Sequence, residues 1–155
     1  MLISRATTAD VVDLAQLLYV DTAGEVGDDE AVDEFAAELG RWWAHRGDSH
    51  AAFVARSTDG EVVGMAWVAF VPRVPRVPRP RATGRLSADI QTVFVRSDHR
   101  GRGLGTALVE AAAEHATRHG AAHVTVHSSR RAVPVDERLG FASSPQLLRT
   151  TAPRT

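Results

Sequence analysis

The sequence predicts an α/β fold, and three observations support this prediction. Apolar residues recur at helical spacing in some segments, β-forming residues gather in others, and a glycine-rich turn joins one strand to a helix. The elements follow in the order βααββ and then βαβαβ. A chain of 155 residues, 44% of them hydrophobic and 24% charged, fits one folded domain, residues 1–155.

Helix-start and hairpin signals define the first half of the chain. Thr7 and Asp10 have the spacing of a capping box ahead of an apolar run, so a helix is expected to follow. The Asp59-Gly60 step is a hairpin signal between two segments rich in β-formers. The expected elements are a strand at Leu2–Arg5, a helix from Val11 that stops before Gly24, a helix near Asp29–His45, and strands at Ala51–Arg56 and Val62–Val71.

A segment rich in proline and arginine separates the two halves. Pro72 to Arg81 reads PRVPRVPRPR, and closely spaced prolines remove N–H donors and favour polyproline II. Neither a helix nor a central strand is compatible with this pattern. We therefore expect a connecting loop within the domain, residues 72–87.

The second half is predicted to alternate strands and helices. The glycines in SDHRGRGLGT follow a strand and lead into a helix with apolar residues at helical spacing. Pro134 interrupts a later, shorter helix, which Gly140 ends. The expected elements are strands at Ala88–Val95, around Val124 and Val126, and near Gln146–Thr150, and helices at Leu104–His119 and Arg131–Leu139.

The composition excludes several kinds of chemistry. The chain has no cysteine and all 18 basic residues are arginine, which excludes disulfides, thiolate metal sites, Schiff bases and a lysine-dependent phosphate loop. A net charge of −1 gives no global positive field for nucleic acid, and the histidines show no paired-ligand pattern. The longest apolar run, Val62–Val71, is too short to span a bilayer. We expect a cytoplasmic protein with no metal, nucleic-acid or membrane partner.

Arg100 to Thr106 reads RGRGLGT and lies between a predicted strand and a predicted helix. Glycines let several backbone N–H groups approach one anion, and the dipole of the following helix adds to the attraction. Two guanidinium groups and a hydroxyl stand beside these N–H groups. The turn therefore predicts a pyrophosphate site.

Spacing distinguishes three kinds of phosphate-binding turn. A Walker loop needs the lysine that this chain lacks, and a dinucleotide fingerprint needs an acidic residue about 20 positions further on, which is missing. The pattern Arg100-x-x-Gly103-x-Gly105 closely resembles motif A of the GNAT superfamily of N-acetyltransferases. The resemblance extends over DIQTVFVRSDHRGRGLGTALV and the later ERLGF. It implies a central, mixed and twisted sheet flanked by helices, with acetyl-CoA as cosubstrate.

The resemblance also implies where acetyl-CoA binds. Val93 and Val95 would offer backbone groups to the pantetheine arm, and Gly101 to Thr106 would hold the pyrophosphate. Ser129 stands where many relatives have an asparagine that contacts the cofactor. The expected cofactor-binding residues are Val93, Phe94, Val95, Arg100, Gly101, Arg102, Gly103, Leu104, Gly105, Thr106 and Ser129.

Acetyl transfer to an amine needs groups that move protons. Asp89 is expected to share one strand face with Val93 and Val95, and His127 ends the following strand, where relatives open a wedge. Asp89 or His127 is expected to accept the proton of the amine, and Ser129 or water to supply one to the thiolate. The alternatives are a surface carboxylate and a strand-end histidine without a catalytic role.

One departure from the family pattern bears on turnover. Relatives commonly end the fourth helix in a segment like FYEKLGF, with a tyrosine that protonates the thiolate, whereas this chain has Asp136 in VDERLGF. With an ordinary pKa of about 3.9, an aspartate has almost no proton to give at neutral pH. We therefore expect Asp136→Asn to leave activity largely intact. The leading interpretation is an N-acetyltransferase, and the alternative is an inactive acyl-CoA-binding sensor or interaction module.

The acceptor stays open at this stage. It is a primary amine on a small molecule or a peptide, and a homodimer is compatible with the resemblance. In one interpretation the loop is a stiff, exposed connector, and its arginines keep it soluble. In the other, they line the acceptor entrance and favour an anionic substrate or the ribose phosphate of the cofactor. These arginines are Arg73, Arg76, Arg79 and Arg81.

Overall fold

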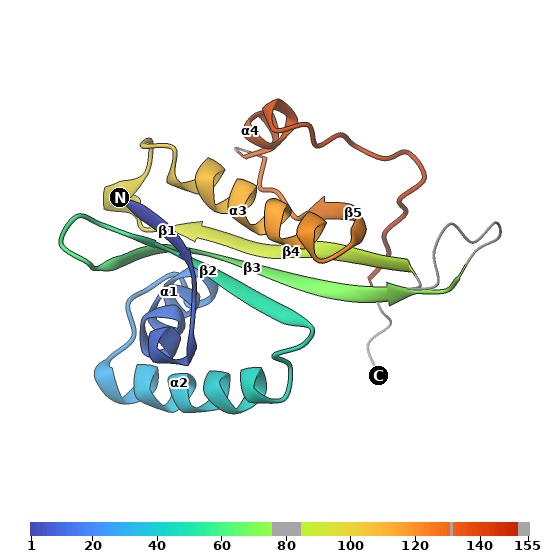
Figure 1. Cartoon of the computed structure of the whole chain (residues 1–155). Helices are drawn as coiled ribbons and strands as arrows, with labels where there is room; N and C mark the ends of the chain where they lie inside the picture. Colours follow the sequence, from blue (N-terminus) through green and yellow to red (C-terminus); the bar gives the residue numbers. More distant parts are fainter. Residues whose placement is uncertain (76–84, 131, 152–155) are drawn as a thin grey trace.

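The computed structural model describes residues 1–75, 85–130 and 132–151 (Figure 1). Within them, five strands form one sheet in the order β1-β2-β3-β4-β5. Neighbouring strands are antiparallel except β4 and β5, which are parallel, so the sheet is mixed as predicted. The strands are β1 (Leu2–Arg5), β2 (His50–Arg56), β3 (Val62–Arg73), β4 (Arg85–Val95) and β5 (Ala121–Val126).

Helices cover both faces of the sheet (Figure 1). Helices α1 (Val11–Ala23) and α2 (Asp29–Ala44) lie on one face. Helix α3 (Leu104–Arg118) lies on the other, with the short α4 (Val133–Arg138) beyond it. In the described part of the chain, no helix has the length and apolar character to cross a membrane.

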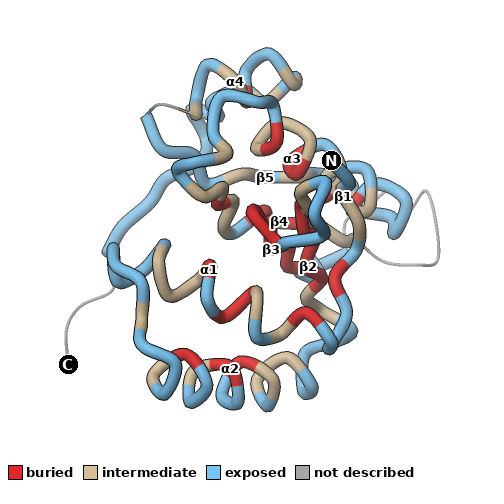
Figure 2. Tube along the Cα trace, turned by 90° about the vertical axis from the view of Figure 1, so that its left-hand side faces the viewer, coloured by how far each residue is buried: buried red, intermediate tan, exposed pale blue. Residues whose placement is uncertain are grey.

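Two apolar clusters fill the space between the sheet and its helices. One joins α3 to the sheet and includes Leu108 and Ile90. The other joins α1 and α2 to the sheet and includes Leu14 and Trp67. Figure 2 shows buried residues along the central strands and on the inward sides of the helices. Because apolar side chains fill both faces, the polar groups that can meet a ligand lie at the ends and edges of strands.

Of two local signals near helix starts, the structure confirms the capping box before α1 and corrects the expectation for Pro134 in α4. Thr7 and Asp10 form the predicted capping box around a 3₁₀ turn, η1 (Thr8–Asp10), directly before α1. Pro134 lies in the first turn of α4, so the expectation that it interrupts this helix is wrong. A proline is tolerated there because its missing N–H would have no acceptor inside the helix.

β3 runs further than the sequence predicts. It continues through Pro72 and Arg73, which pair with the first residues of β4, so the loop expectation is wrong for these two residues and for residues 85–87, which belong to β4. β2 pairs with β3 only from Ala69 back toward the hairpin, so the end of β3 has β4 as its one neighbour. A proline is tolerated at such an edge. Arg76, Arg79 and Arg81 lie outside the described residues.

The strand expected near Gln146–Thr150 is not formed. These residues are turn and coil after α4. Leu147 and Leu148 are 71% and 90% exposed, so no packing holds them extended. Intrinsic β-propensity alone is too weak to fix a strand without such packing.

An irregularity in the pairing of β3 with β4 changes which side chains of β4 share a face. Ile90 pairs with Val68 and Thr92 pairs with Trp67, the next residue of β3. Gln91 is therefore an extra residue in β4, a β-bulge. Because side chains alternate along a strand, one extra residue reverses the facing of everything before it.

Candidate active site

β4 and β5 run side by side for only part of β4. Their parallel pairing extends from Leu86 to Ile90 of β4, and the amide of His127 donates a 3.2 Å hydrogen bond to the carbonyl of Ile90. Within the described residues, β4 continues to Val95 without a neighbour on this side. The two strands therefore separate after Ile90 and leave backbone groups of β4 open.

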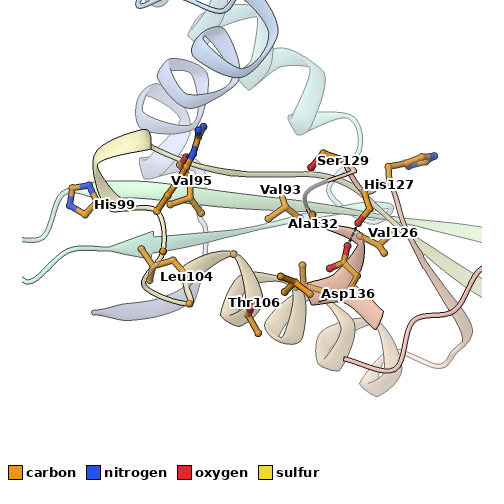
Figure 3. A pocket seen from close by; sticks show the side chains of 17 residues that line it. Val93, Val95, His99, Leu104, Thr106, Val126, His127, Ser129, Ala132 and Asp136 are labelled. Atoms are coloured by element: carbon orange, nitrogen blue, oxygen red, sulfur yellow. Dashed lines mark hydrogen bonds between the residues drawn. The ribbon is translucent and has the colours of Figure 1, made fainter. Parts of the chain in front are cut away.

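A cavity of about 360 Å³ lies where the two strands separate (Figure 3). Its walls come from β4, from the glycine-rich turn with the start of α3, and from the end of β5 with α4. The predicted cofactor-binding residues that line it are Val93, Val95, Arg100, Gly101, Gly103, Leu104, Gly105, Thr106 and Ser129. The sequence segments that carry the motif are thus brought together around one space.

The turn before α3 presents its backbone to this cavity. Gly101 and Gly103 have φ values of 75° and 77°, a conformation that favours glycine, and Gly103 is the N-cap of α3. A Cβ atom added at Gly101, Gly103 or Gly105 would meet no protein atom within 4 Å, so the space in front of the backbone is open. The first N–H groups of a helix have no acceptor inside it and carry the positive end of its dipole. This geometry suits a phosphate group.

The side chains of three predicted cofactor-binding residues, Arg100, Phe94 and Arg102, have different surroundings. Arg100 donates a 2.9 Å hydrogen bond from Nε to the carbonyl of Val95 and lies 5.7 Å from the ring centre of Phe94, which ties the turn to the end of β4. The side chain of Phe94 is buried in the cluster with α1 and α2, so its backbone alone is left for a ligand. Arg102 is exposed and does not line the cavity.

Asp89 does not share the strand face of Val93 and Val95, contrary to the sequence-based expectation. Val93, Val95 and Ile90 pack in the cluster with α3. The bulge at Gln91 turns Asp89 to the opposite face, which α1 and α2 cover. The expectation failed because it assumed uninterrupted alternation along β4.

Asp89 and His127 nevertheless lie together. The hydroxyl of Thr125 donates a 2.8 Å hydrogen bond to Oδ1 of Asp89, and Nδ1 of His127 lies 3.5 Å from the same oxygen. The His127 side chain is 67% exposed, so a proton on this pair can exchange with water. Because His127 also lines the cavity, the pair connects the cavity with the α1–α2 face of the sheet.

Sequence reasoning missed two polar residues of the cavity, His99 and Ser128, and gave Asp136 the pKa of an ordinary aspartate. Asp136 is in fact 6% exposed and accepts a hydrogen bond from the hydroxyl of Ser128 (Figure 3). Burial raises the pKa of the Asp136 carboxyl. Helical spacing was the available signal, since Ala132, Asp136 and Leu139 fall on one face of a helix.

Charge is divided between the two faces of the sheet. Every charged side chain between Arg5 and Arg41 is acidic, and this stretch forms α1 and most of α2. Asp21 of α1 reaches the sheet, where it accepts a 3.0 Å hydrogen bond from the hydroxyl of Thr92. The helices that cover the face of Asp89 are therefore mainly acidic. The glycine-rich turn, with two arginines, is the positive side of the opening.

A mixed sheet with two diverging parallel strands, and an amide-rich turn beside the opening, defines an α/β protein whose cavity suits a phosphate-bearing ligand. The sequence model of the Acetyltransferase (GNAT) family matches residues 12–141. The chain therefore belongs to the GNAT family and is an acetyl-CoA-dependent acetyltransferase. The resemblance predicted from motif A is confirmed.

Solved structures share this fold over almost the whole chain. An acetyltransferase from Trypanosoma brucei has a TM-score of 0.74 at 24% identity, with 97% of this chain and 99% of that chain covered. A predicted acetyltransferase from Clostridium acetobutylicum, with acetyl-CoA, has 0.71 at 18%, with 97% and 95% covered. Glucosamine-6-phosphate N-acetyltransferase from Arabidopsis thaliana has 0.71 at 18%, with 97% of each chain covered. These likenesses show the fold. No curated protein matches the sequence.

Proposed function

We propose that this acetyltransferase transfers an acetyl group from acetyl-CoA directly to a primary amine. One observation carries the proposal: a single opening between β4 and β5 joins the anion-binding turn to the Asp89–His127 pair. The acetyl donor and the amine would enter this opening from opposite faces of the sheet. Positioning two reactants in this way replaces a bimolecular encounter by a reaction within one complex.

The residues around the cavity fit acetyl-CoA. The N–H groups of the turn, from Gly101 to Thr106, would hold the pyrophosphate, because the added Cβ positions show open space there. The free backbone groups of Val93 and Val95 would take the pantetheine arm as an added strand. Ser129 lines the far part of the cavity and would contact the arm through its hydroxyl. Bound acetyl-CoA supplies an acetyl group that is activated as a thioester.

Asp89 and His127 would prepare the amine. An amine attacks only in its neutral form, so the site must remove a proton from the ammonium ion. The Asp89 carboxylate, fixed by Thr125, would attract the ammonium group. His127 would take the proton and pass it to water, to which most of its side chain is exposed. In this proposal Asp89 and His127 act as one unit.

A panel of amines tests the proposed function. The protein is incubated with acetyl-CoA and each amine in turn, and released CoA thiol is measured together with the acetylated product. Thiol release that depends on an amine supports the enzyme. Binding of acetyl-CoA without thiol release from any amine would instead support the non-catalytic sensor.

A further inference from the structure

Two aspartates are buried in the described part of the chain, and their surroundings differ. Asp10 is 7% exposed and accepts hydrogen bonds from the amide of Thr7 and the guanidinium of Arg56. Asp136 is 6% exposed, and among the described residues no basic side chain lies within ion-pair distance of it. Its side-chain partner is the neutral hydroxyl of Ser128. Burial without a compensating cation shifts this carboxyl toward the neutral acid and so raises its pKa.

The charged groups near Asp136 do not replace the missing cation. Of the basic groups that line the same cavity, Arg100 is bonded to the carbonyl of Val95 and His127 faces Asp89. His99, the third, faces the carboxylate of Asp98. On its own helix, Asp136 is followed by another acid, Glu137, which supplies no positive charge.

Asp136 borders the cavity that is proposed to hold acetyl-CoA. It forms part of the cavity wall opposite β4, and its side chain points toward the end of β5 (Figure 3). The Ser128 hydroxyl donates to Oδ2, so Oδ1 is left to carry a proton. The cavity thus has an acid on one side of the strand opening and the Asp89–His127 pair on the other.

We propose that Asp136 is the proton donor to the sulfur that leaves during acyl transfer, with Ser128 as a positioning residue that orients its carboxyl. This role rests on the proposed N-acetyltransferase function. The amine nitrogen forms a bond to the acyl carbon, the C–S bond breaks with its electron pair on sulfur, and the proton of Oδ1 passes to that sulfur. The proton that the amine loses leaves through His127, and water returns one to Asp136. The products are an amide and a thiol.

Asp136→Asn tests the role, because the amide has the shape of the acid without its acidic proton. Because Asp136 is buried, we now expect the opposite of the sequence-based expectation: kcat should fall by about 10²-fold or more, with the acetyl-CoA dissociation constant unchanged in calorimetry. The matched control is Glu137→Gln, the neighbouring carboxylate on the same helix, which should keep kcat. A kcat for Asp136→Asn within about threefold of wild type would overturn the proposal.

Two further measurements separate a chemical role from a structural one. In ¹³C NMR of carboxyl-labelled aspartate, the resonance missing from Asp136→Asn should titrate well above the ordinary value of about 3.9. Titration near that value refutes the donor role. Ser128→Ala should lower kcat without changing the KM for acetyl-CoA, and Ser128→Thr should restore it. A wild-type protein that releases no thiol with any amine refutes the proposed function and the donor role with it, whatever the titration shows.

Discussion

Nδ1 of His127 lies 3.5 Å from Oδ1 of Asp89, although the two residues belong to different strands. The contact depends on the parallel pairing of β4 with β5, which continues to Ile90 and Val126. It also depends on the bulge at Gln91, which brings Asp89 to the face that His127 reaches. Two titratable groups are thereby held beside the opening that leads to the cavity.

Replacing Asp89 tests whether this contact serves catalysis. We expect Asp89→Asn to lower kcat by about 10²-fold, because the amide can neither attract an ammonium ion nor support proton removal by His127. Acetyl-CoA affinity should stay unchanged, since Asp89 does not line the cavity. Glu110→Gln, an exposed change on α3, is the control. Equal activity of the two variants would leave the Asp89–His127 pair without a catalytic role.

A substitution in the turn tests the cofactor site. Gly105 has no positive φ and open space before it, so Gly105→Val should fold normally while its side chain obstructs the pyrophosphate. Calorimetry should show a large loss of acetyl-CoA affinity, with the melting temperature of the free protein near that of wild type. Gly103→Val is less informative, because φ there is 77° and any side chain is strained.

The control for Gly105→Val is Gly47→Val, a position that also has open space and no positive φ but lies far from the turn in sequence and does not line the cavity. Its acetyl-CoA affinity should match that of wild type. Tight binding of acetyl-CoA by a folded Gly105→Val protein would contradict the assignment of the turn.

The acidic face predicts a preference among amines. A diamine such as 1,4-diaminobutane should have a higher kcat/KM than an amine that carries a phosphate, because α1 and the start of α2 supply only negative charges. Added salt should reduce this difference, and Asp21→Asn should reduce it further. A preference for the phosphorylated amine would instead favour the interpretation in which loop arginines receive an anionic acceptor.

The two buried aspartates predict opposite pH effects on stability. Burial raises the pKa of Asp10, but the Thr7 amide and the Arg56 guanidinium lower it by more, so the net pKa is depressed. Asp10 therefore stabilises the fold above the unfolded pKa of about 3.9, and this contribution is lost as pH falls through the folded pKa. The pKa of Asp136 is raised by burial, so its contribution declines as pH rises from about 3.9 through the folded pKa.

Urea unfolding between about pH 2 and pH 8 measures both effects, because the Asp10 contribution is lost below about pH 3.9. Asp10→Asn should lose stability relative to wild type at neutral pH and lose less in acid. Asp136→Asn should gain stability relative to wild type as the pH rises. If the two variants shift in the same direction with pH, one of the two environments is wrongly described.

Local patterns in the sequence were enough to predict the glycine-rich turn. Features that depend on contacts between distant parts of the chain could not be predicted in this way. Arg100 to Thr106 forms its site from consecutive residues, so the spacing of glycines and the following helix determine the geometry. The sheet face to which Asp89 points depends on how β3 and β4 pair. The bulge at Gln91 cannot be recognised from the sequence of β4 alone. The burial of Asp136 depends on β5 and on the position of α4, which no local pattern specifies.

The bulge at Gln91 divides β4 into two stretches that would meet different molecules. Residues after it, such as Val93 and Val95, line the cavity proposed for acetyl-CoA, whereas Asp89 before it faces the side proposed for the amine. Changes upstream of Gln91 can therefore alter the choice of amine while the donor site stays intact. Deleting Gln91 would couple the choice of amine to the donor site. The side chains of β4 would then alternate without interruption, which would turn Asp89 toward the proposed donor side. In the proposed enzyme, this one additional residue would allow the choice of amine and the binding of acetyl-CoA to change independently.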